Sequence, residues 1–504
     1  MSELPPGWAL ANLPDMLTQE GVFCDGDWVE SKDQDPAGDV RLIQLADVGD
    51  GSYRNRSARF LTSSKAQELR CTFLQPGDVL IARMPDPLGR ACSFPGDSKA
   101  CVTVVDVCVV RPGSGGVSPL WLIYTVNSPR ARRAMVPYEM GTTRKRISRK
   151  NLARIPLPVP PLAEQERIVA AIEEHFSRLD AAVAALERVR RNLIRMRNAV
   201  LHAAVTGGLI AREGDGVPFE VLESDGPLSA HLSNENARKV NRAKADLSHR
   251  SWQVPPSWRW LGAAEVCEVV TSGSTPSSNA MTAGHGEVPY IKVYNLTNRG
   301  VLDFSVRPTF ISHATNAGRL SRSRLQPGDI LTNIVGPPLG KVALVPGDYP
   351  EWNTNQAVVV FRPVRRLHPL LLKYWLLSPP VLALLKSTSR ATAGQFNVSL
   401  TTCRALPLPI PPRAEQEAIV DSIEEHLSRI ESQEQVAAAA LIHTTHLRSA
   451  ILAAAFFGKL VVQDPNDEPA SVLLERIAAE RASSKGHRTT NARKPRTTRP
   501  KVLA

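Results

Sequence analysis

Apolar and small residues recur in alternating steps of four and three along one long segment of the chain, which begins after residue 161. This spacing places the side chains on one stripe of an α-helix and is typical of a coiled coil. The stripe continues for about five and a half heptads, so it predicts a rod about 66 Å long that ends at Gly207 and Gly208. The predicted seam consists of Ile168, Ile172, His175, Leu179, Ala182, Leu186, Val189, Leu193, Met196 and Val200.

A second segment, from about residue 413 to 457, repeats this pattern and stops before Gly458. Each helix follows a proline-rich sequence, PLPVPPLAEQE from Pro156 and PLPIPPRAEQE from Pro407. Prolines cannot continue a helix and favour extended backbone, so both sequences predict a stiff connection into the helix. The second predicted seam includes Ile419, Ile423, Ile430, Leu447 and Ile451.

The repetition extends far beyond the helices. LPPGW from Leu4 matches VPPSW from Val254, and LQPGDVLIAR from Leu74 matches LQPGDILTNI from Leu325. The offset is 250 or 251 residues across most of these matches. A repeat of this length indicates a duplicated architecture, so the chain is predicted to be a globular unit followed by a helix, used twice.

Within each globular unit, short β-rich runs alternate with turn residues. VRLIQLADV from Val40 and VPYIKVYNL from Val288 predict strands, and LWLIYTV from Leu120 and LLLKYWLL from Leu370 predict helices. Each unit is therefore predicted to be a mixed α+β domain. The predicted boundaries are 1–155 and 251–406 for the globular domains, 156–208 and 407–460 for the helices, 209–250 for a polar linker, and 461–504 for a short helix and a basic disordered tail.

The charges on the two long helices predict how they pair. Arginines gather toward the end of the first helix, whereas acidic residues gather toward the start of the second. An antiparallel pairing sets the arginines against the acids, and a row of such pairs can fix helix orientation. We therefore expect an antiparallel intramolecular coiled coil. The arginines are Arg188, Arg190, Arg191, Arg195 and Arg197, and the acids are Glu415, Glu417, Asp421, Glu424, Glu425, Glu431 and Glu434.

Composition narrows the class of protein. The 504-residue chain has a formal net charge of +12, which favours a polyanionic partner such as nucleic acid. Its seven scattered cysteines form no CxxC pair, which favours reduced thiols over a zinc site or a disulfide framework. No apolar run of about 18 residues and no N-terminal signal pattern is apparent. A cytoplasmic protein without a membrane partner is expected.

The doubled proline-rich motif, the paired LQPGD sequences and the repeated plan of a domain followed by a helix resemble the specificity subunit of type I restriction–modification systems. The resemblance covers about residues 1–480. It implies two tandem mixed α/β target recognition domains, each reading part of a bipartite site in double-stranded DNA. It further implies that the helices set the spacing and that two methyltransferase subunits and the restriction (motor–nuclease) subunits assemble on this chain. The subunit itself would bind no cofactor, since S-adenosylmethionine, ATP and magnesium would belong to the partner subunits.

Basic and amide side chains in matching loops are candidates for DNA contact, since such groups bind phosphates and base edges. Each is also compatible with an ordinary solvated loop or a turn cap. Arg90 and Lys341 follow matching PLG turns, and Arg83 and Asn333 end the matching LQPGD strands. The remaining candidates are Arg54, Arg56, Arg322, Arg324, Asn355 and Gln356.

Acidic and amide residues open both helices, where they suit the positive end of the helix dipole. They are also candidates for contact with the methyltransferase, and they comprise Glu164, Gln165, Glu166, Glu415, Gln416 and Glu417. His175 and His426 share one seam position, but no further ligands lie nearby in the sequence, so packed histidines are favoured over a metal site.

Two other functional classes compete with DNA recognition. A loose nuclease-like pattern, Pro14–Asp15 followed by Glu30 and Lys32, is not reproduced in the second half. No phosphate-binding loop and no methyltransferase motif is present. A nuclease or methyltransferase with a cryptic site is therefore the weaker hypothesis, and a non-enzymatic coiled-coil adaptor that binds proteins is the other alternative.

Overall fold

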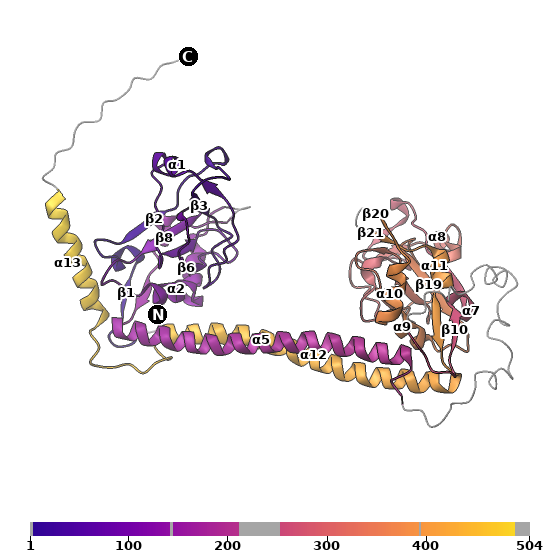
Figure 1. The fold of residues 1–504 in the computed structure, drawn as a ribbon. Helices are drawn as coiled ribbons and strands as arrows, with labels where there is room; N and C mark the ends of the chain where they lie inside the picture. The colour runs from indigo at the N-terminus through magenta and orange to yellow at the C-terminus, as the bar shows by residue number, and fades with distance from the viewer. Residues whose placement is uncertain (1–3, 142–144, 211–251, 393–394, 489–504) are drawn as a thin grey trace, which may run out of the picture. The chain divides into compact units, whose positions relative to one another are not determined.

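A computed structural model describes residues 4–141, 145–210, 252–392 and 395–488. The chain divides into two compact units. Unit 1 comprises Met1–Leu186 and Ala439–Ala504, and unit 2 comprises Glu187–Ala438. Each unit therefore contains one globular domain together with part of both long helices, which are labelled α5 and α12 in Figure 1.

The globular domain of unit 1 is built around two small sheets. A four-stranded antiparallel sheet has the order β2-β8-β5-β6, and a three-stranded sheet has the order β4-β3-β7 with β3 and β7 parallel. A separate pair joins β1 to β9, the strand that leads into α5. The strands are β1 (Ala9–Ala11), β2 (Val22–Asp25), β3 (Val40–Ile43), β4 (Phe60–Leu61), β5 (Val79–Ala82), β6 (Ala91–Ser93), β7 (Ala100–Thr103), β8 (Val107–Arg111) and β9 (Leu157–Val159).

Helices cover one side of the four-stranded sheet of unit 1. Trp121 and Ile123 of one of them, α2, lie in a single core with strand residues such as Val79 and with the first turns of α5. Ser118 caps α2, and the proline after it starts the helix at a position where its missing N–H costs nothing. The helices and 3₁₀ turns are η1 (Leu13–Met16), η2 (Ser31–Asp33), α1 (Ser63–Glu68), α2 (Pro119–Asn127), α3 (Pro129–Met135), η3 (Val136–Tyr138), α4 (Arg149–Leu152) and α5 (Leu162–Thr206).

Unit 2 repeats this topology, with β12 added at the edge of its second sheet, β12-β14-β13-β18, and with a further small sheet, β16-β21-β20. Its antiparallel sheet has the order β11-β19-β15-β17, and β10 pairs with β22 just before α12. The strands are β10 (Arg259–Gly262), β11 (Cys267–Ser272), β12 (Thr282–Ala283), β13 (Val288–Ile291), β14 (Thr309–Ile311), β15 (Ile330–Asn333), β16 (Val335–Gly336), β17 (Val342–Leu344), β18 (Asn353–Thr354), β19 (Val358–Pro363), β20 (Arg390–Thr392), β21 (Gln395–Asn397) and β22 (Pro407–Ile410).

The predicted mixed α+β class is confirmed in both units, as are the helices predicted near residues 120 and 370. The strand predicted over Val40–Val48 is too long, because the backbone turns after Ile43, where the Asp47 carboxylate accepts a hydrogen bond from the Gln44 N–H. The helices and 3₁₀ turns of unit 2 are α7 (Ala263–Val266), η7 (Ser278–Ala280), η8 (Val293–Asn295), α8 (His313–Ala317), η9 (Ser321–Ser323), α9 (Pro369–Leu377), α10 (Pro379–Ser387), α11 (Leu400–Ala405) and α12 (Arg413–Phe456).

The two long helices run antiparallel. In unit 1 the first turns of α5, with Ile168 and Ile172, share a core with Phe456 at the end of α12. In unit 2 the last turns of α5, with Leu201, share a core with Ile419 near the start of α12. Since opposite ends meet in both units, the predicted orientation is confirmed. Gly207 and Gly458, which follow the two helices, have φ of 78° and 67°, a left-handed conformation suited to a helix end.

The predicted heptad seam is only partly right in the second half of α5, where Leu193 is buried as predicted. Val189 and Met196 were assigned to the seam, yet both side chains are about half exposed, whereas Arg197 is buried. On α12, Leu447 is likewise exposed. A straight α-helix has 3.6 residues per turn, so a strict seven-residue repeat drifts by about 20° per heptad away from the contact face. Over this length the drift turns Val189 and Met196 away from the contact between α5 and α12.

The predicted orientation of the helices is right, but only one of the five predicted arginines forms an ion pair with α12 in the part of the chain that the structure describes. Of the five arginines, Arg197 reaches α12, with an Nη1–Oε1 distance of 3.5 Å to Glu431. Arg190 pairs along its own helix with Glu187, and the other three make no ion pair within the part of the chain that the structure describes. In unit 1, Arg448 of α12 pairs with Asp180 of α5. These residues lie 251 positions from Arg197 and Glu431, so the same interhelix ion pair occurs twice.

A C-terminal helix, α13 (Ala470–Arg488), packs on the beginning of the chain in unit 1 (Figure 1). Leu473 and Ile477 are buried in the core of unit 1, and the Arg481 guanidinium donates to the Pro14 carbonyl. The short helix predicted here is confirmed, but the predicted disordered tail starts too early, because residues 481–488 are helical. The remainder of the tail and most of the predicted linker lie outside the described residues.

One helix of the described chain, α12, is long and apolar enough to span a membrane by length and composition alone. Helices α9 and α10 pass the same test only when the bent pair is counted as one span. Both are largely buried in the core of unit 2, and α12 packs along α5 in each unit. Length and composition do not distinguish such helices from those of a soluble protein.

Candidate nucleic-acid interface

The repeated proline-rich motif forms a joint between each globular domain and its long helix. In unit 1 the Trp8 indole N–H donates to the Glu164 carboxylate at 2.9 Å, and in unit 2 Trp258 donates to Glu415 at the same distance. These tryptophans belong to the matching LPPGW and VPPSW sequences. The prolines before each helix lie in β9 and β22, which pair with β1 and β10. The motif therefore fixes the first turn of the helix against the domain.

The glutamine of the same motif secures a second helix. Gln165 accepts from the Ser118 N–H at 2.9 Å, at the start of α2, and donates to the Pro160 carbonyl at 3.0 Å. Gln416 makes the equivalent bonds to His368 at 2.8 Å and Pro411 at 3.2 Å. Each glutamine side chain thereby accepts a hydrogen bond from a backbone N–H at the start of a helix, where no carbonyl of the helix itself can accept it.

The predicted contact of these residues with a methyltransferase is not supported where they are buried. Glu164, Gln165 and Gln416 are buried, and Glu415 is half-buried against Trp258. Burial raises the pKa of the Glu164 carboxyl, partly offset by the hydrogen bond from Trp8. Only Glu166 and Glu417 are exposed, so these two remain available to a partner.

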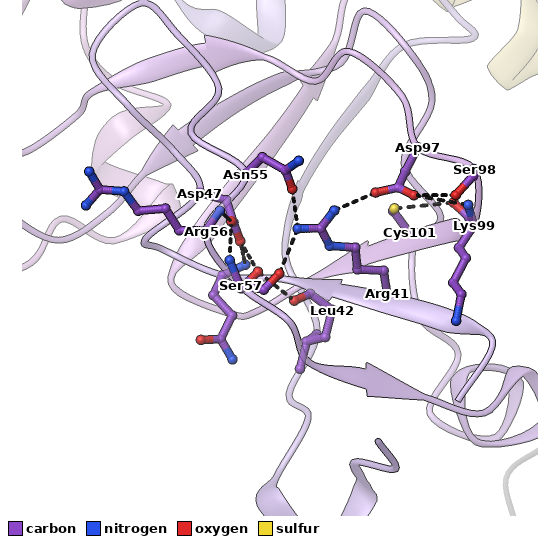
Figure 2. A network of polar contacts seen from close by, with 11 residues as sticks. Arg41, Leu42, Asp47, Asn55, Arg56, Ser57, Asp97, Ser98, Lys99 and Cys101 are labelled. Carbon is purple, nitrogen blue, oxygen red and sulfur yellow. Dashed lines mark hydrogen bonds and ion pairs between the residues drawn. The ribbon is translucent and has the colours of Figure 1, made fainter. Parts of the chain in front are cut away.

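A polar network in unit 1 holds the basic loop at residues 54–59 in place (Figure 2). The buried Asp47 carboxylate accepts from the backbone N–H groups of Arg56 at 2.6 Å and Ser57 at 2.8 Å, and from the Ser57 hydroxyl. Burial alone would raise the pKa of Asp47, but these hydrogen bonds lower it below its usual value. The loop backbone is thus anchored from inside the domain.

Arg41 braces the same loop from β3. Its guanidinium contacts Asp97 at 2.6 Å, the Ser57 carbonyl at 2.7 Å and the Asn55 side chain. Asn55 has φ of 48°, a left-handed conformation that asparagine tolerates better than most residues. Figure 2 shows the Arg56 side chain pointing away from this network. Arg54 and Arg56 are both exposed, so the anchored loop carries two cationic side chains that face solvent.

Two of the predicted DNA contacts in unit 1 have structural roles instead. Arg90 is buried, and all three of its guanidinium nitrogens donate to backbone carbonyls, among them Val48 at 2.7 Å and Leu45 at 3.0 Å. Arg83 is largely covered, pairing with Asp25 at 3.0 Å and donating to the Val105 carbonyl. Donors that are already engaged inside the domain are poorly placed to contact phosphate.

Unit 2 anchors the equivalent loop with Asn295 in place of Asp47. β13 and β14 pair in the same register as β3 and β4, which aligns the two positions. The Asn295 amide donates to the carbonyls of Asp303 at 3.0 Å and Val306 at 2.8 Å, and its oxygen accepts from the Lys292 N–H at 2.9 Å. The sequence alone does not mark this loop, since residues 304–309 read FSVRPT and lack the basic run found in unit 1. Its one arginine, Arg307, has φ of 47°.

Two predicted candidates of unit 2 meet through a neighbouring segment. The exposed Arg322 donates to the Ser274 hydroxyl at 2.8 Å, and the adjacent Thr275 hydrogen-bonds the exposed Gln356. Tyr290 supports this segment by donating to the Ser274 carbonyl at 2.7 Å. The structure therefore gathers these side chains into one polar surface patch.

The other candidates of unit 2 are less available. Asn333 is buried and bonds within its own turn, to the carbonyl of Pro338 at 2.8 Å and the N–H of Lys341 at 2.9 Å. Its predicted DNA contact is therefore replaced by a turn-stabilising role. Arg324 is exposed but ion-paired with Glu351. Lys341 and Asn355 are half-buried.

A family model described as the type I restriction modification DNA specificity domain matches residues 28–190 and again residues 258–439. The chain belongs to this family. Both matches start in a globular domain and end within a long helix. The resemblance inferred from the repeated motifs is thus confirmed.

Individual relatives agree with the family. The chain is 27% identical over 368 residues to the type I restriction enzyme EcoBI specificity subunit of Escherichia coli, an alignment that covers 69% of each chain. It is 22% identical to the EcoKI specificity subunit of Escherichia coli strain K12, over 97% of this chain and 98% of the relative. A chain solved in work on complex assembly and conformational transition of the type I R-M system superposes with a TM-score of 0.61 at 19% identity. That alignment covers 91% of this chain and 100% of the solved one, and it shows the fold.

An exposed tryptophan marks a further position in the first specificity domain that the sequence analysis did not single out. Trp28 is 70% exposed, and its indole N–H donates to Glu30 at 3.1 Å. Trp28 follows Gly26 by two residues, as Thr275 follows Gly273. A Cβ on Gly26 would collide with the backbone oxygen of Val104, and a Cβ on Gly273 with that of Thr354, 250 residues later. The two loops are therefore equivalent in the repeat.

The specificity domains offer no metal centre in the described part of the chain, where no group of three or more potential ligands occurs. His426 bonds its own helix at the Ser422 carbonyl, at 2.8 Å, as expected for a packed histidine. The residues of the nuclease-like pattern make local contacts, with Asp15 capping η1 and Glu30 paired with Lys32 at 2.7 Å. The cysteines are unpaired, and burial raises the pKa of thiols such as that of Cys92.

Proposed function

We propose that this specificity subunit recognises a bipartite site in double-stranded DNA, with each globular domain reading one half. The observation that carries the proposal is the paired loop at residues 47–59 and 295–309. Both loops are held by one buried polar anchor, Asp47 or Asn295, while the residues they expose differ. A constant scaffold with variable surface residues is what two readers of different sequences require.

The antiparallel helices α5 and α12 are proposed to set the spacing between the half-sites. A stiff helical connection converts protein length into a fixed separation of DNA contacts. It also raises the effective concentration of the second reader once the first is bound. The joints at Trp8–Glu164 and Trp258–Glu415 support this role, because each holds its domain to the first turn of a helix.

Partner subunits are proposed to supply the chemistry. Two methyltransferase subunits and the restriction subunits would assemble on this chain, with S-adenosylmethionine, ATP and magnesium bound by those partners. The formal charge of +12 favours the phosphate contacts that such an assembly needs. We place the assembly in the cytoplasm, where cellular DNA would be modified.

Mapping methylated adenines tests the proposal. The chain is produced together with its methyltransferase partner, and genomic DNA is sequenced for modified bases. We expect a motif in two parts, separated by unread bases of fixed number. A continuous motif would contradict the two-reader arrangement.

Two assays separate the competing functions. Turnover of DNA by the purified chain alone, with magnesium and S-adenosylmethionine, would favour a cryptic enzyme. DNA affinity that is insensitive to salt would favour an adaptor that binds proteins, because phosphate contacts release counterions and weaken steeply with salt.

A further inference from the structure

A groove of about 780 Å³ lies between the globular domain of unit 1 and the long helices of the same unit. Tyr124 of α2 and Phe176 of α5 form its aromatic wall, with ring centroids 5.9 Å apart. Small residues of the loop at 50–52 form its rim, and Leu452 of α12 also lines it. The volume is large enough for several side chains, so it is a site rather than a packing defect.

The internal repeat shows what occupies the equivalent place in unit 2. Tyr374 and Glu424 correspond to Tyr124 and Glu173, 250 and 251 positions earlier. There the Lys373 ammonium lies 4.2 Å from the centroid of the Tyr374 ring, and the Tyr374 hydroxyl donates to Glu424 at 3.2 Å. Unit 2 therefore places its own cation beside this tyrosine and glutamate.

A longer loop fills the rest of that space in unit 2. Five residues separate the bridged pair Leu296 and Leu302, whereas four separate Val48 and Tyr53 in unit 1. The longer loop brings Arg299 to Glu434 of α12, at 2.5 Å. It also places Gly300 where a Cβ would touch Lys373 and Leu377. The loop and the lysine together close the groove of unit 2 from within the chain.

Unit 1 lacks both closing elements. Ile123 stands where unit 2 has Lys373, and the shorter loop, residues 49–52, contains no arginine or lysine. Two acids of the groove are satisfied, since Asp50 pairs with Arg132 and Asp180 with Arg448. Glu173 makes no ion pair within the described residues of either unit. Arg448 already lies over the Phe176 ring, 4.5 Å from its centroid, whereas no cation of the described residues lies over the Tyr124 ring. The groove thus presents Tyr124 and the exposed Glu173 carboxylate, the counterparts of the residues beside the Lys373 ammonium group in unit 2.

We propose that this groove binds a basic segment of the methyltransferase subunit, with one lysine or arginine lying between Tyr124 and Glu173. The inference rests on the proposed function and names a contact within it. A cation over an aromatic face and beside a carboxylate is favourable when water is partly excluded. Because unit 2 fills its own groove, the two ends of the chain would hold their partner subunits unequally.

Substitution of Glu173 tests the groove against a matched control on the same helix. Glu173→Gln removes the uncompensated charge, while Glu174→Gln makes the same change outside the groove, at a residue paired with Arg178. The affinity of the full chain for the purified methyltransferase subunit is measured by titration calorimetry without DNA, and thermal unfolding checks that each variant is folded.

We expect Glu173→Gln to weaken one of the two binding events about tenfold, with Glu174→Gln unchanged. Equal affinities for Glu173→Gln and Glu174→Gln would overturn the proposal. A gain in DNA affinity for Glu173→Gln, with methyltransferase binding unchanged, would instead make DNA the occupant and would also overturn it. If the unaltered chain bound no methyltransferase at all, the proposed function would fail, which is a distinct result.

Discussion

At the scale of single residues, one buried polar side chain in each unit decides the shape of a surface loop. Asp47 uses both carboxylate oxygens as acceptors, whereas Asn295 uses its amide group to donate to carbonyls. The two loops therefore present different backbone groups to the same kind of anchor. Exchanging the anchors would oppose donor to donor in unit 1 and acceptor to acceptor in unit 2, so each loop is matched to its own residue.

Replacing Asp47 is expected to destabilise unit 1. Asp47→Ala leaves buried N–H groups without an acceptor and should lower the free energy of unfolding by about 1–3 kcal/mol. Asp47→Asn should cost about half as much, because its amide nitrogen faces N–H donors where one oxygen accepted. Urea denaturation measures both.

The pH dependence of that difference follows from the lowered pKa of Asp47. A carboxyl whose folded pKa lies below the unfolded value contributes stability above the unfolded pKa and loses it as pH falls through the folded pKa. The gap between the unaltered protein and Asp47→Ala should thus stay constant from about pH 8 to 5 and narrow only below about pH 4. A gap that changed near neutrality would point to a different group.

Removing an exposed arginine of the anchored loop should reduce the salt dependence of DNA binding. Each lost phosphate contact lowers the slope of log affinity against log salt by about 0.9. We expect this for Arg54→Ala and Arg56→Ala, measured by fluorescence titration of a duplex. Arg178→Ala, an exposed arginine of α5 that pairs with Glu174, is the matched control and should leave the slope unchanged.

At the scale of elements, the contact face of α5 is decided by helix geometry rather than by the apolar repeat. Arg197 is buried although it is charged, while Met196 beside it is exposed although it is apolar. The guanidinium of Arg197 reaches Glu431 and also donates to the Arg299 carbonyl at 3.3 Å. A charged residue can be buried where such partners satisfy it.

Charge reversal on α5 should distinguish the true contact face from the predicted one. Arg197→Glu places a carboxylate beside Glu431 and should lower the free energy of unfolding by about 2 kcal/mol. Arg195→Glu makes the same charge change on the exposed face and should alter it by less than about 0.5 kcal/mol. Equal effects in chemical denaturation would contradict the observed helix contact.

The hydrogen bond between Trp8 and Glu164, which joins the domain to the helix, can be tested by its contribution to stability. Trp8→Phe keeps the aromatic packing but removes the N–H that binds the buried Glu164 carboxylate, at a cost of about 1–3 kcal/mol. Trp28→Phe makes the same change at an exposed tryptophan and should be nearly neutral. Thermal unfolding compares the two variants.

The cost of Trp8→Phe should also depend on pH. A carboxyl with a raised folded pKa, such as Glu164, contributes stability that is present below its unfolded pKa and lost as pH rises through the folded pKa. The hydrogen bond from Trp8 stabilises the charged form of Glu164, so removing it lowers the free energy of unfolding only when Glu164 is ionised. The penalty should therefore be larger at pH 7 than at pH 4, and an equal penalty at both would contradict a bond to the carboxylate.

At the scale of the whole molecule, the duplication gives each unit its own set of contacts. The interhelix ion pair, the tryptophan–glutamate joint and the glutamine cap each occur twice at matching positions. The sites that differ are surface loops and the groove of unit 1. A chain of this design can change the surface of one unit without changing the other.

Substitutions in one unit should therefore affect one half of the DNA site. Arg54→Ala with Arg56→Ala should relax sequence preference in one half, and Arg322→Ala with Gln356→Ala should relax it in the other. Methylation of a randomised DNA library with the partner subunit measures both halves at once, so the unaltered half serves as the control. Equal loss in both halves would contradict independent readers.

The sequence by itself determined the duplication, the mixed α+β class and the antiparallel orientation of the long helices. These follow from repeated motifs, hydrophobic periodicity and charge distribution, which are all local or additive along the chain. Only the tertiary structure decided which candidates face outward, burying Arg90 and Gln165 and leaving Arg54 and Arg56 exposed. The reason is that burial depends on which backbone carbonyls and helix starts converge around a side chain, and those partners lie up to 47 residues away along the sequence.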